Sequence, residues 1–313
     1  MTFSILLFVG GLVLLYFGAE YLVSGSSRLA RSYGVRPLII GMTVVAFATS
    51  MPELTVSLLA AIRGSANIAV GNIIGSNVAN LGLILGAASL VAPIPVARVT
   101  LKREIPFMIG ASLLLYLLAL DGQLGTIDGM ALCGMLLLFL GYCLRTARAA
   151  PVEGVPTVPQ PLAKKGERGR DLLWIFLGLV GLVVGADLMV RGAISIARAL
   201  GVSDLVIGMS VVALGTSLPE LAASLMSAWQ GEVDIGIGNV IGSNIFNLLF
   251  VLGVCPLIRP LAVEPSTLAF ELPVMVGFSV ALLPLLILRP VLTRPKGGLL
   301  LAGYLLFVAK LFF

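Results

Sequence analysis

Two glutamates, Glu53 and Glu220, each directly follow a proline inside an apolar stretch, in the sequences TSMPE and TSLPE. A carboxylate at membrane depth costs about 2.5 to 3.5 kcal/mol on insertion scales, so such residues usually face an internal cavity and mark a pathway. A structural ion pair is the alternative, but it needs a basic partner, and neither stretch provides one near its middle. We therefore expect both glutamates to bind a cation.

The two prolines, Pro52 and Pro219, should interrupt the helices that carry these glutamates. Proline has no N–H to bond the carbonyl four residues back, and its ring pushes that carbonyl aside. Backbone oxygen is thereby freed around Thr49 and around Thr216. In lipid this is tolerated where the broken turn lines a cavity or where a ligand takes over the lost bonds. A kink for packing alone explains one such proline better than it explains two at equivalent positions.

Hydroxyl and amide groups share a helix face with each glutamate, because residues three and four apart lie on one side of a helix. The two stripes are Ala46, Thr49, Ser50, Glu53 and Ser57, and Ala213, Thr216, Ser217, Glu220 and Ser224. The following segments, GNIIGSNVAN and GNVIGSNIFN, repeat a polar residue every fourth position: Asn72, Ser76 and Asn80, and Asn239, Ser243 and Asn247. Their glycines form small-xxx-small faces that let helices approach closely.

These groups together form a ligand set for a hard cation. Calcium takes about 6 to 8 oxygens at about 2.3 to 2.6 Å and tolerates irregular geometry, whereas magnesium requires a strict octahedron. The chain has no histidine, and its three cysteines lie in apolar segments without metal-type spacing, which indicates core packing. Two carboxylates neutralise one divalent ion or share two or three monovalent ones.

The same two charges favour exchange over a leak. Two ionised glutamates without a cation are costly to enclose in a low-dielectric barrier. The occluded, switching state should therefore be reached readily only with cations bound, which describes obligatory antiport in outline.

Two other classes of function are less favoured by the sequence. A cation channel also uses rings of oxygen, but no selectivity-filter motif is present. A membrane enzyme is disfavoured because GIGNVIG, residues 236–242, lies in an apolar span without a preceding strand, and no Ser/His pair or Asp-rich diphosphate motif occurs. We expect neither catalysis nor a bound cofactor.

The composition places these residues in an integral membrane protein. The 313 residues are 59% hydrophobic and 11% charged, whereas soluble domains carry roughly a quarter charged residues. Apolar runs long enough to cross a bilayer, about 20 residues each, tile the chain. We expect an all-α fold with ten transmembrane helices, near residues 4–27, 38–62, 67–93, 105–120, 126–145, 171–190, 205–228, 234–258, 267–288 and 297–312.

An internal repeat divides the chain. An offset of 167 residues aligns 41–94 with 208–261 without a gap, and 27 of the 54 positions are identical. Residues 151–170, rich in Pro, Gly and charge, form a linker between a first five-helix repeat, 1–150, and a second, 171–313. Five spans per half invert the second repeat relative to the first, an arrangement typical of secondary transporters that bind substrate at the midplane.

The placement of charge predicts the orientation. With the N-terminus outside, 15 of the 20 Lys and Arg residues fall on inward-facing connections, as the positive-inside rule requires. Both termini should therefore be extracytoplasmic. We interpret these basic residues as solvated helix ends and not as a nucleic-acid surface.

The paired TSxPE and GNxxGSNxxN motifs resemble the alpha-repeats of the cation/calcium antiporter superfamily, specifically the prokaryotic sodium/calcium exchangers. The resemblance implies a plasma (inner) membrane location, and it implies that the long first and sixth helices slide to give alternating access. It implies that Glu53 and Glu220 bind Ca²⁺ with the carbonyls of Thr49 and Thr216. One implied Na⁺ site comprises Ala46, Thr49, Ser50, Glu53 and Ser76, and its mirror comprises Ala213, Thr216, Ser217, Glu220 and Ser243. Asn80 and Asn247 would line the middle.

Two departures from the family pattern matter. Ala48 replaces a usual glycine, and Asn247 stands where sodium-coupled relatives often have Asp, as in many proton-coupled exchangers. The amide argues against the potassium-dependent branch and leaves sodium or proton coupling open. We predict exchange of Ca²⁺ for Na⁺, with H⁺ as the alternative coupling ion and the lipid bilayer as the only other partner. No protein partner is predicted.

Overall fold

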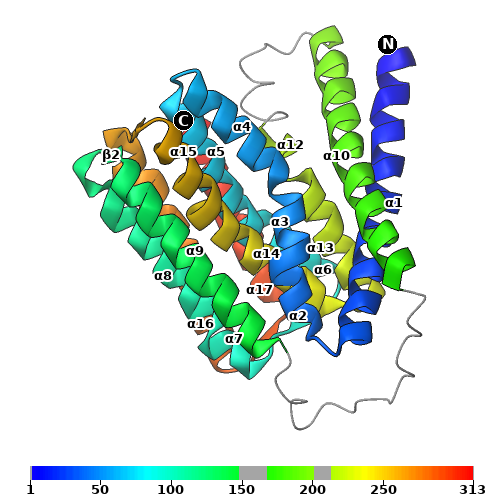
Figure 1. The fold of residues 1–313 in the computed structure, drawn as a ribbon. Coiled ribbons are helices and arrows are strands. Elements are labelled where there is room, and N and C mark those ends of the chain that lie inside the picture. The colour runs from blue at the N-terminus through cyan, green and yellow to red at the C-terminus, as the bar shows by residue number, and fades with distance from the viewer. Residues whose placement is uncertain (1, 148–167, 201–212, 313) are drawn as a thin grey trace.

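A computed structural model describes residues 2–147, 168–200 and 213–312, and these fold almost entirely into helices (Figure 1). Most of the linker predicted at 151–170 and the start of the span predicted at 205–228 lie outside the described residues. The elements before residue 147 are α1 Thr2–Tyr33, α2 Pro37–Ile40, η1 Gly41–Val45, α3 Ala46–Thr49, α4 Met51–Ile62, α5 Ala66–Ala79, η2 Asn80–Ile84, α6 Leu85–Val91, β1 Ile94–Pro95, α7 Arg98–Lys102, α8 Glu104–Leu118, η3 Ala119–Asp121, β2 Gln123–Leu124 and α9 Thr126–Thr146.

The second half has a matching order of elements. They are α10 Arg168–Ala199, α12 Ala213–Gly215, α13 Leu218–Gln230, α14 Val233–Phe246, η5 Asn247–Val251, α15 Leu252–Ile258, β3 Leu261–Ala262, η6 Thr267–Glu271, α16 Leu272–Ile287, β4 Val291–Leu292 and α17 Arg294–Phe312. Helices α1 and α10 overlap the first and sixth predicted spans and extend several residues beyond the predicted ends.

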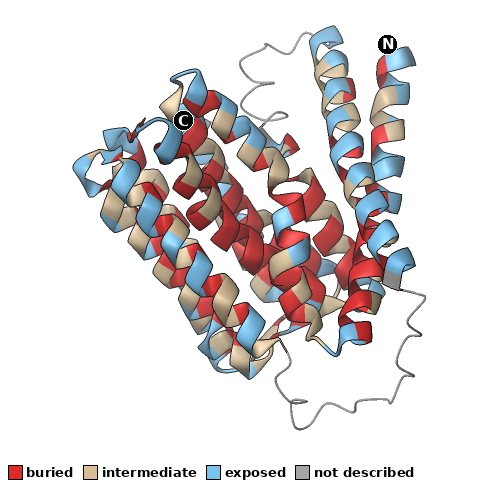
Figure 2. Cartoon of the chain, in the orientation of Figure 1, coloured by how far each residue is buried: buried red, intermediate tan, exposed pale blue. Residues whose placement is uncertain are grey.

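The helices are those of a membrane protein. Seven described helices are long and apolar enough to cross a bilayer, and a bent pair, Pro37–Thr49 with Met51–Ile62, makes an eighth candidate. The spans Ala66–Val91 and Val233–Ile258 are 72% and 78% buried over their apolar windows, whereas the other five are 28% to 44% buried. These two spans therefore form the centre of the bundle, and the rest present apolar side chains outward (Figure 2).

Helices α1 and α10 lie side by side on one edge of the molecule and run antiparallel (Figure 1). Glycines let their backbones touch: a Cβ added to Gly11 would lie 2.6 Å from the carbonyl oxygen of Gly185, and one added to Gly18 would lie 2.9 Å from that of Gly178. Small residues of this kind allow close packing where lipid provides no hydrophobic driving force. An apolar side chain at these positions would push the two helices apart.

Contacts between the halves occur in reciprocal pairs. β1 pairs with β4, with Ile94 opposite Leu292, and β2 pairs with β3, with Leu124 opposite Leu261. Because β3 lies 167 residues after β1, and β4 168 residues after β2, the two ladders occupy equivalent places in the two halves. The hydroxyls of Ser112 and Ser279, also 167 residues apart, hydrogen bond to each other at 3.2 Å.

Candidate cation site

The helix breaks predicted at the two prolines are present. Ser50, with a ψ of 2°, separates α3 from α4, and the chain bends by 44° there. In the second half, Ser217, with a ψ of 4°, immediately precedes α13. Each proline occupies the first turn of the new helix, where its missing N–H leaves no bond unmade.

Each glutamate follows its proline in that first turn and points into the protein. Glu53 and Glu220 are each 1% exposed. In this position a carboxylate also benefits from the positive end of the helix dipole. Ser217, three residues before Glu220, donates to the carboxylate of Glu53, so the helix turns that carry the two glutamates lie in one region of the core. Among the described residues, no lysine or arginine forms an ion pair with either of them.

Two serines contact the carboxylate of Glu53, and one comes from the other half. Ser217 donates to Glu53 Oε1 at 3.2 Å, and Ser76 lies 3.5 Å from the same oxygen. The two hydroxyls are themselves 3.3 Å apart. The break in the second half thus contributes directly to the surroundings of the first glutamate.

Two threonines form a second reciprocal link across the halves. Thr49, on α3, donates to Asn239 Oδ1 at 3.0 Å and lies 3.4 Å from the hydroxyl of Ser243, both on α14. Thr216, just before α13, lies 3.5 Å from Asn72 Oδ1 on α5. The Thr49 hydroxyl also lies 3.4 Å from the carbonyl oxygen of Ala46. The polar residues at every fourth position of α14 therefore face the helix break of the first half, and those of α5 face the helix break of the second half.

This contact is possible because α14 approaches η1 and α3 closely. A Cβ added to Gly242 would lie 2.5 Å from the carbonyl oxygen of Met42 and 2.6 Å from the side chain of Ala46. The small-xxx-small face predicted for Gly238 and Gly242 is thus confirmed. For the equivalent glycines on α5, the corresponding partners, residues 205 and 209, lie outside the described residues.

Asn80 and Asn247 each begin a π-helical turn, η2 and η5. π-bulges of this kind occur frequently at functional sites. Element η2 packs against α13, which carries Glu220, and η5 packs against α4, which carries Glu53. Both asparagines are buried, and Asn247 Nδ2 donates to Asn77 Oδ1 at 3.1 Å.

Asn77 and Asn244 are two further buried amides in this region, and the ladder spacing does not predict them. They are buried in the GSN sequences, and Asn77 Nδ2 lies 3.5 Å from the carbonyl oxygen of Asn244. Their position one residue after Ser76 and Ser243 takes them off the four-residue ladder, so the spacing alone did not reveal them. The identity of the two motifs at these positions is the signal that could have done so.

Seven buried polar atoms at the expected ligands have no hydrogen-bond partner within the described structure. A buried polar atom left without a partner costs about 1 to 3 kcal/mol, so such a group needs an explanation. Six of the seven are oxygens, and the exception is the amide nitrogen of Asn80. The atoms are Ser50 Oγ, Glu53 Oε2, Asn80 Oδ1 and Nδ2, Glu220 Oε1 and Oε2, and Asn247 Oδ1.

The remaining expected ligands lie on the same elements. Ala46 is buried at the start of α3, and Ala213 begins α12, although the described residues do not include its side chain. No group of three or more His, Cys, Asp or Glu side chains able to hold a metal occurs in the described ranges. A cation at this site would therefore be bound by hydroxyls, amides and carbonyls around only two carboxylates, which suits a hard ion.

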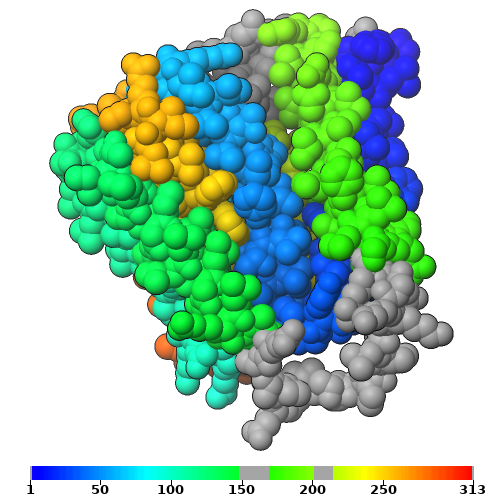
Figure 3. All heavy atoms as spheres, in the orientation of Figure 1, coloured from blue at the N-terminus to red at the C-terminus, as the bar shows by residue number. Residues whose placement is uncertain are grey.

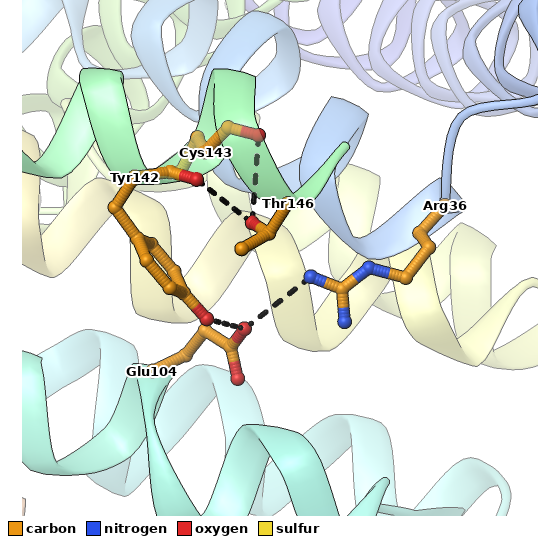
Figure 4. A network of polar contacts seen from close by, with 5 residues as sticks. All are labelled: Arg36, Glu104, Tyr142, Cys143 and Thr146. Atoms are coloured by element: carbon orange, nitrogen blue, oxygen red, sulfur yellow. Dashed lines mark hydrogen bonds and ion pairs between the residues drawn. The ribbon is translucent and has the colours of Figure 1, made fainter. Parts of the chain in front are cut away.

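A second buried acidic residue, Glu104, belongs to a different cluster of polar contacts, which the sequence did not predict (Figure 4). Glu104 is fully buried at the start of α8, accepts a hydrogen bond from the Tyr142 hydroxyl at 2.8 Å, and lies 3.5 Å from Arg36 Nη2. Arg36 immediately precedes α2. These partners are far apart in sequence, so no local pattern pointed to them. The cluster ties the start of the broken span to α8 and α9.

The fold and this region together define an all-α membrane protein with two buried carboxylates that form no ion pair with any lysine or arginine among the described residues. Comparison with known proteins gives the family. The family described as "Sodium/calcium exchanger protein" matches residues 3–145 and 171–313, and the chain belongs to it.

Similar proteins cover nearly the whole chain. The putative antiporter CaxA of Alkalimonas amylolytica is 42% identical over 275 residues, 87% of this chain and 86% of its own length. The sodium/calcium exchanger MaX1 of Methanosarcina acetivorans is 33% identical over 350 residues, 100% and 99% of the two chains. The solved structure of the sodium-calcium exchanger NCX_Mj soaked with 10 mM Na⁺ and zero Ca²⁺ is 35% identical, with a TM-score of 0.87 over 98% of each chain.

Proposed function

We propose that this chain is a secondary-active antiporter that exchanges Ca²⁺ for Na⁺ across the plasma membrane of a prokaryote by alternating access. The observation that carries the proposal is the set of seven unpartnered polar atoms on Ser50, Glu53, Asn80, Glu220 and Asn247. Burying these atoms without a ligand is costly, and a hard cation would satisfy the six oxygens among them. The family and the names of the similar proteins support Ca²⁺ and Na⁺ as the ions.

In the proposed site, Ca²⁺ is bound by Glu53 and Glu220 with the carbonyls of Thr49 and Thr216. The serines that contact Glu53 support this assignment, because they hold its carboxylate while leaving Oε2 available. Ions that replace Ca²⁺ occupy two equivalent Na⁺ sites, one in each half. The ligands of the first are Ala46, Thr49, Ser50, Glu53 and Ser76, and those of the second are Ala213, Thr216, Ser217, Glu220 and Ser243.

Charge balance supports exchange as the mode of transport. Two carboxylates without a counterion are expensive to enclose in protein. The occluded state is consequently reached with one divalent ion or with several monovalent ions bound, so each kind of ion is carried in place of the other.

We further propose ten membrane spans in two inverted repeats, with both termini extracytoplasmic. The reciprocal contacts of β1 with β4 and β2 with β3, and the antiparallel pair α1 and α10, support a two-fold relation of the halves. Glu53 and Glu220 then lie near the axis that relates the halves, where inverted-repeat transporters bind their substrates.

Asn247 supports one alternative, coupling to H⁺. This buried residue offers the site a neutral amide where a carboxylate would add charge and Na⁺ affinity. A site with only two carboxylates can exchange one Ca²⁺ for two protons without a change of charge.

The two coupling ions are distinguished by Ca²⁺ uptake into vesicles containing the purified protein, under an outward Na⁺ gradient or an outward H⁺ gradient. We expect uptake under the Na⁺ gradient, loss of that uptake in Glu53→Gln and Glu220→Gln, and retention in the control Glu264→Gln, an exposed glutamate. Uptake driven only by the H⁺ gradient would show that the coupling ion is H⁺ and not Na⁺. Full-rate uptake by Glu220→Gln would overturn the site.

A further inference from the structure

Asn77 and Asn244 occupy equivalent positions in the two repeats, and each is only 1% exposed. They lie on α5 and α14, in the two most buried spans of the bundle. In the space-filling view α4, α9, α10 and α15 form much of the visible surface (Figure 3), and α5 lies behind α4 and α15 (Figure 1). A polar side chain this far from the surface needs partners within the protein.

The amide of Asn77 is oriented by the main chain of the other repeat. Its Nδ2 lies 3.5 Å from the carbonyl oxygen of Asn244 and 3.8 Å from Sδ of Met275. A backbone carbonyl only accepts hydrogen bonds, so the amide atom that faces it must be the nitrogen. Asn77 Oδ1 is therefore turned to the other side of the planar amide, where it can accept a hydrogen bond.

Asn77 Oδ1 in turn orients the amide of Asn247. Because this oxygen accepts, Asn247 faces it with Nδ2, which donates at 3.1 Å. The other end of the same amide, Asn247 Oδ1, has no hydrogen-bond partner within the described part of the chain. Asn247 begins η5, which packs against α4, the helix that carries Glu53.

This orientation matters because the two ends of an amide have opposite polarity. Oδ1 carries lone pairs that can coordinate a cation, whereas Nδ2 carries two N–H donors whose partial positive charge repels one. A half-turn of the Asn247 side-chain amide would exchange the two ends. Its bond to Asn77 prevents that exchange.

The equivalent bond is absent from the other repeat. An offset of 167 residues would pair Asn80 Nδ2 with Asn244 Oδ1. Instead, the side-chain oxygen and nitrogen of both Asn80 and Asn244 lack a partner among the described residues. The two asparagines of the candidate site thus differ, because the amide of Asn247 is held and that of Asn80 is not.

We propose that Asn77 is a positioning residue that holds the Asn247 amide with its oxygen free for the transported cation. The inference rests on the proposed function, in which Asn247 lines the cation site. Asn77 is not itself a ligand, since its nitrogen and its oxygen both contact the protein. It acts through Asn247, and it makes that neutral residue an oxygen ligand and not an N–H donor.

Equilibrium binding of radiolabelled Ca²⁺ to the purified full-length protein tests the proposal. Asn77→Ala removes the acceptor and should weaken Ca²⁺ binding about tenfold, because the ion loses a contact with an oriented oxygen. Asn244→Ala is the matched control. It removes an equally buried amide at the equivalent position whose side-chain atoms bond nothing in the described structure, so it should bind as the wild type does.

A double-mutant cycle separates positioning from a general effect on packing. Asn247→Ala alone should weaken Ca²⁺ binding, and adding Asn77→Ala to it should cause no further loss, because the residue through which Asn77 acts is already gone. If Asn77 only supported the packing of α5 against α14, the two losses would multiply. Thermal unfolding without Ca²⁺ checks that each variant is folded, and Asn77→Val, which fills the space with hydrocarbon, provides a second variant without an acceptor.

Three results would overturn the positioning role: wild-type affinity in folded Asn77→Ala or Asn77→Val, equal losses in Asn77→Ala and Asn244→Ala, or losses that multiply in the cycle. Glu220→Gln distinguishes these results from a failure of the proposed function. If Glu220→Gln loses Ca²⁺ binding while Asn77→Ala retains it, only the role of Asn77 is wrong. If Glu220→Gln binds Ca²⁺ fully, the cation site is wrong and the role of Asn77 fails with it.

Discussion

The hydroxyl of Ser217 donates a hydrogen bond to the carboxylate of Glu53, at 3.2 Å, across the boundary between the two halves of the chain. Ser217 lies three residues before Glu220, so the break that introduces one glutamate also orients the other. Neither half can complete the site alone, because Glu53 depends on a hydroxyl from the second half and Thr49 depends on the amide of Asn239.

We predict that Ser217→Ala weakens Ca²⁺ binding by about tenfold or more. A hydrogen bond to a charged group contributes about 1.5 to 3 kcal/mol, and each 1.4 kcal/mol is a factor of ten in affinity. Isothermal titration of the detergent-purified protein with Ca²⁺ measures the change. Ser266→Ala, at an exposed serine beside Glu264, provides the control and should bind as the wild type does. Unchanged affinity in Ser217→Ala would show that this hydroxyl does not belong to the site.

Calcium should stabilise the folded protein, and chelation should remove that stabilisation. A ligand present at 100 times its dissociation constant adds about 2.7 kcal/mol to the free energy of unfolding. We expect Ca²⁺ to raise the unfolding temperature in detergent by several degrees for the wild type and for Glu264→Gln. Glu220→Gln should show no shift, since it removes one of the two charges that hold the ion. A shift of equal size in Glu220→Gln would place the ion elsewhere.

The contact between α1 and α10 predicts that these helices move as one body. The hydroxyls of Ser4 and Ser195 are 2.7 Å apart, whereas Ser24 on α1 bonds to Gln230 at the end of α13, at 3.2 Å. After the three native cysteines are replaced, cysteines at 4 and 195 can be joined by a disulfide, and cysteines at 24 and 230 by a short bismaleimide. The first link should leave vesicle Ca²⁺ uptake intact.

The second link should stop uptake, because it ties α1 to the helix that carries Glu220 and prevents sliding. Uncrosslinked samples of each double-cysteine protein are the controls. Uptake that survives the link between positions 24 and 230 would mean that α1 does not slide past α13 during transport.

The cluster around Glu104 should matter for stability and not for ion selectivity. Removing one partner of a buried charge pair costs about 3 to 5 kcal/mol, because the other charge is left uncompensated. We therefore expect Arg36→Gln to lower the unfolding temperature strongly, and the double variant Arg36→Gln/Glu104→Gln to recover part of the loss. Thermal unfolding in detergent measures both. A double variant less stable than Arg36→Gln would contradict the pairing.

Much of the site could be predicted because its residues repeat at fixed local spacing. Pro52 and Pro219 indicated the helix breaks from backbone chemistry alone, and the four-residue ladders predicted which side chains share a face. The burial of Glu53 and Glu220 followed from their position within apolar segments. Each of these features depends on residues within one or two helical turns.

Features that depend on distant residues could not be predicted. Nothing in the sequence around Asn80 or Asn247 distinguishes a π-turn from an α-turn, because tertiary packing decides which bond forms. The partners of Glu104 come from α9 and from the start of α2, so only the fold brings them together.

The matched ladders, β1 with β4 and β2 with β3, bear on how the chain evolves. A two-fold arrangement uses each inter-repeat contact twice, so a substitution in one copy alters only one of two otherwise equivalent contacts. At positions where the two repeats differ, such as Ala48 and its equivalent Gly215, the two repeats no longer make identical contacts. The inward-open and outward-open conformations would then differ in free energy. Such differences between the repeats would determine to which side of the membrane the ion-free protein preferentially opens.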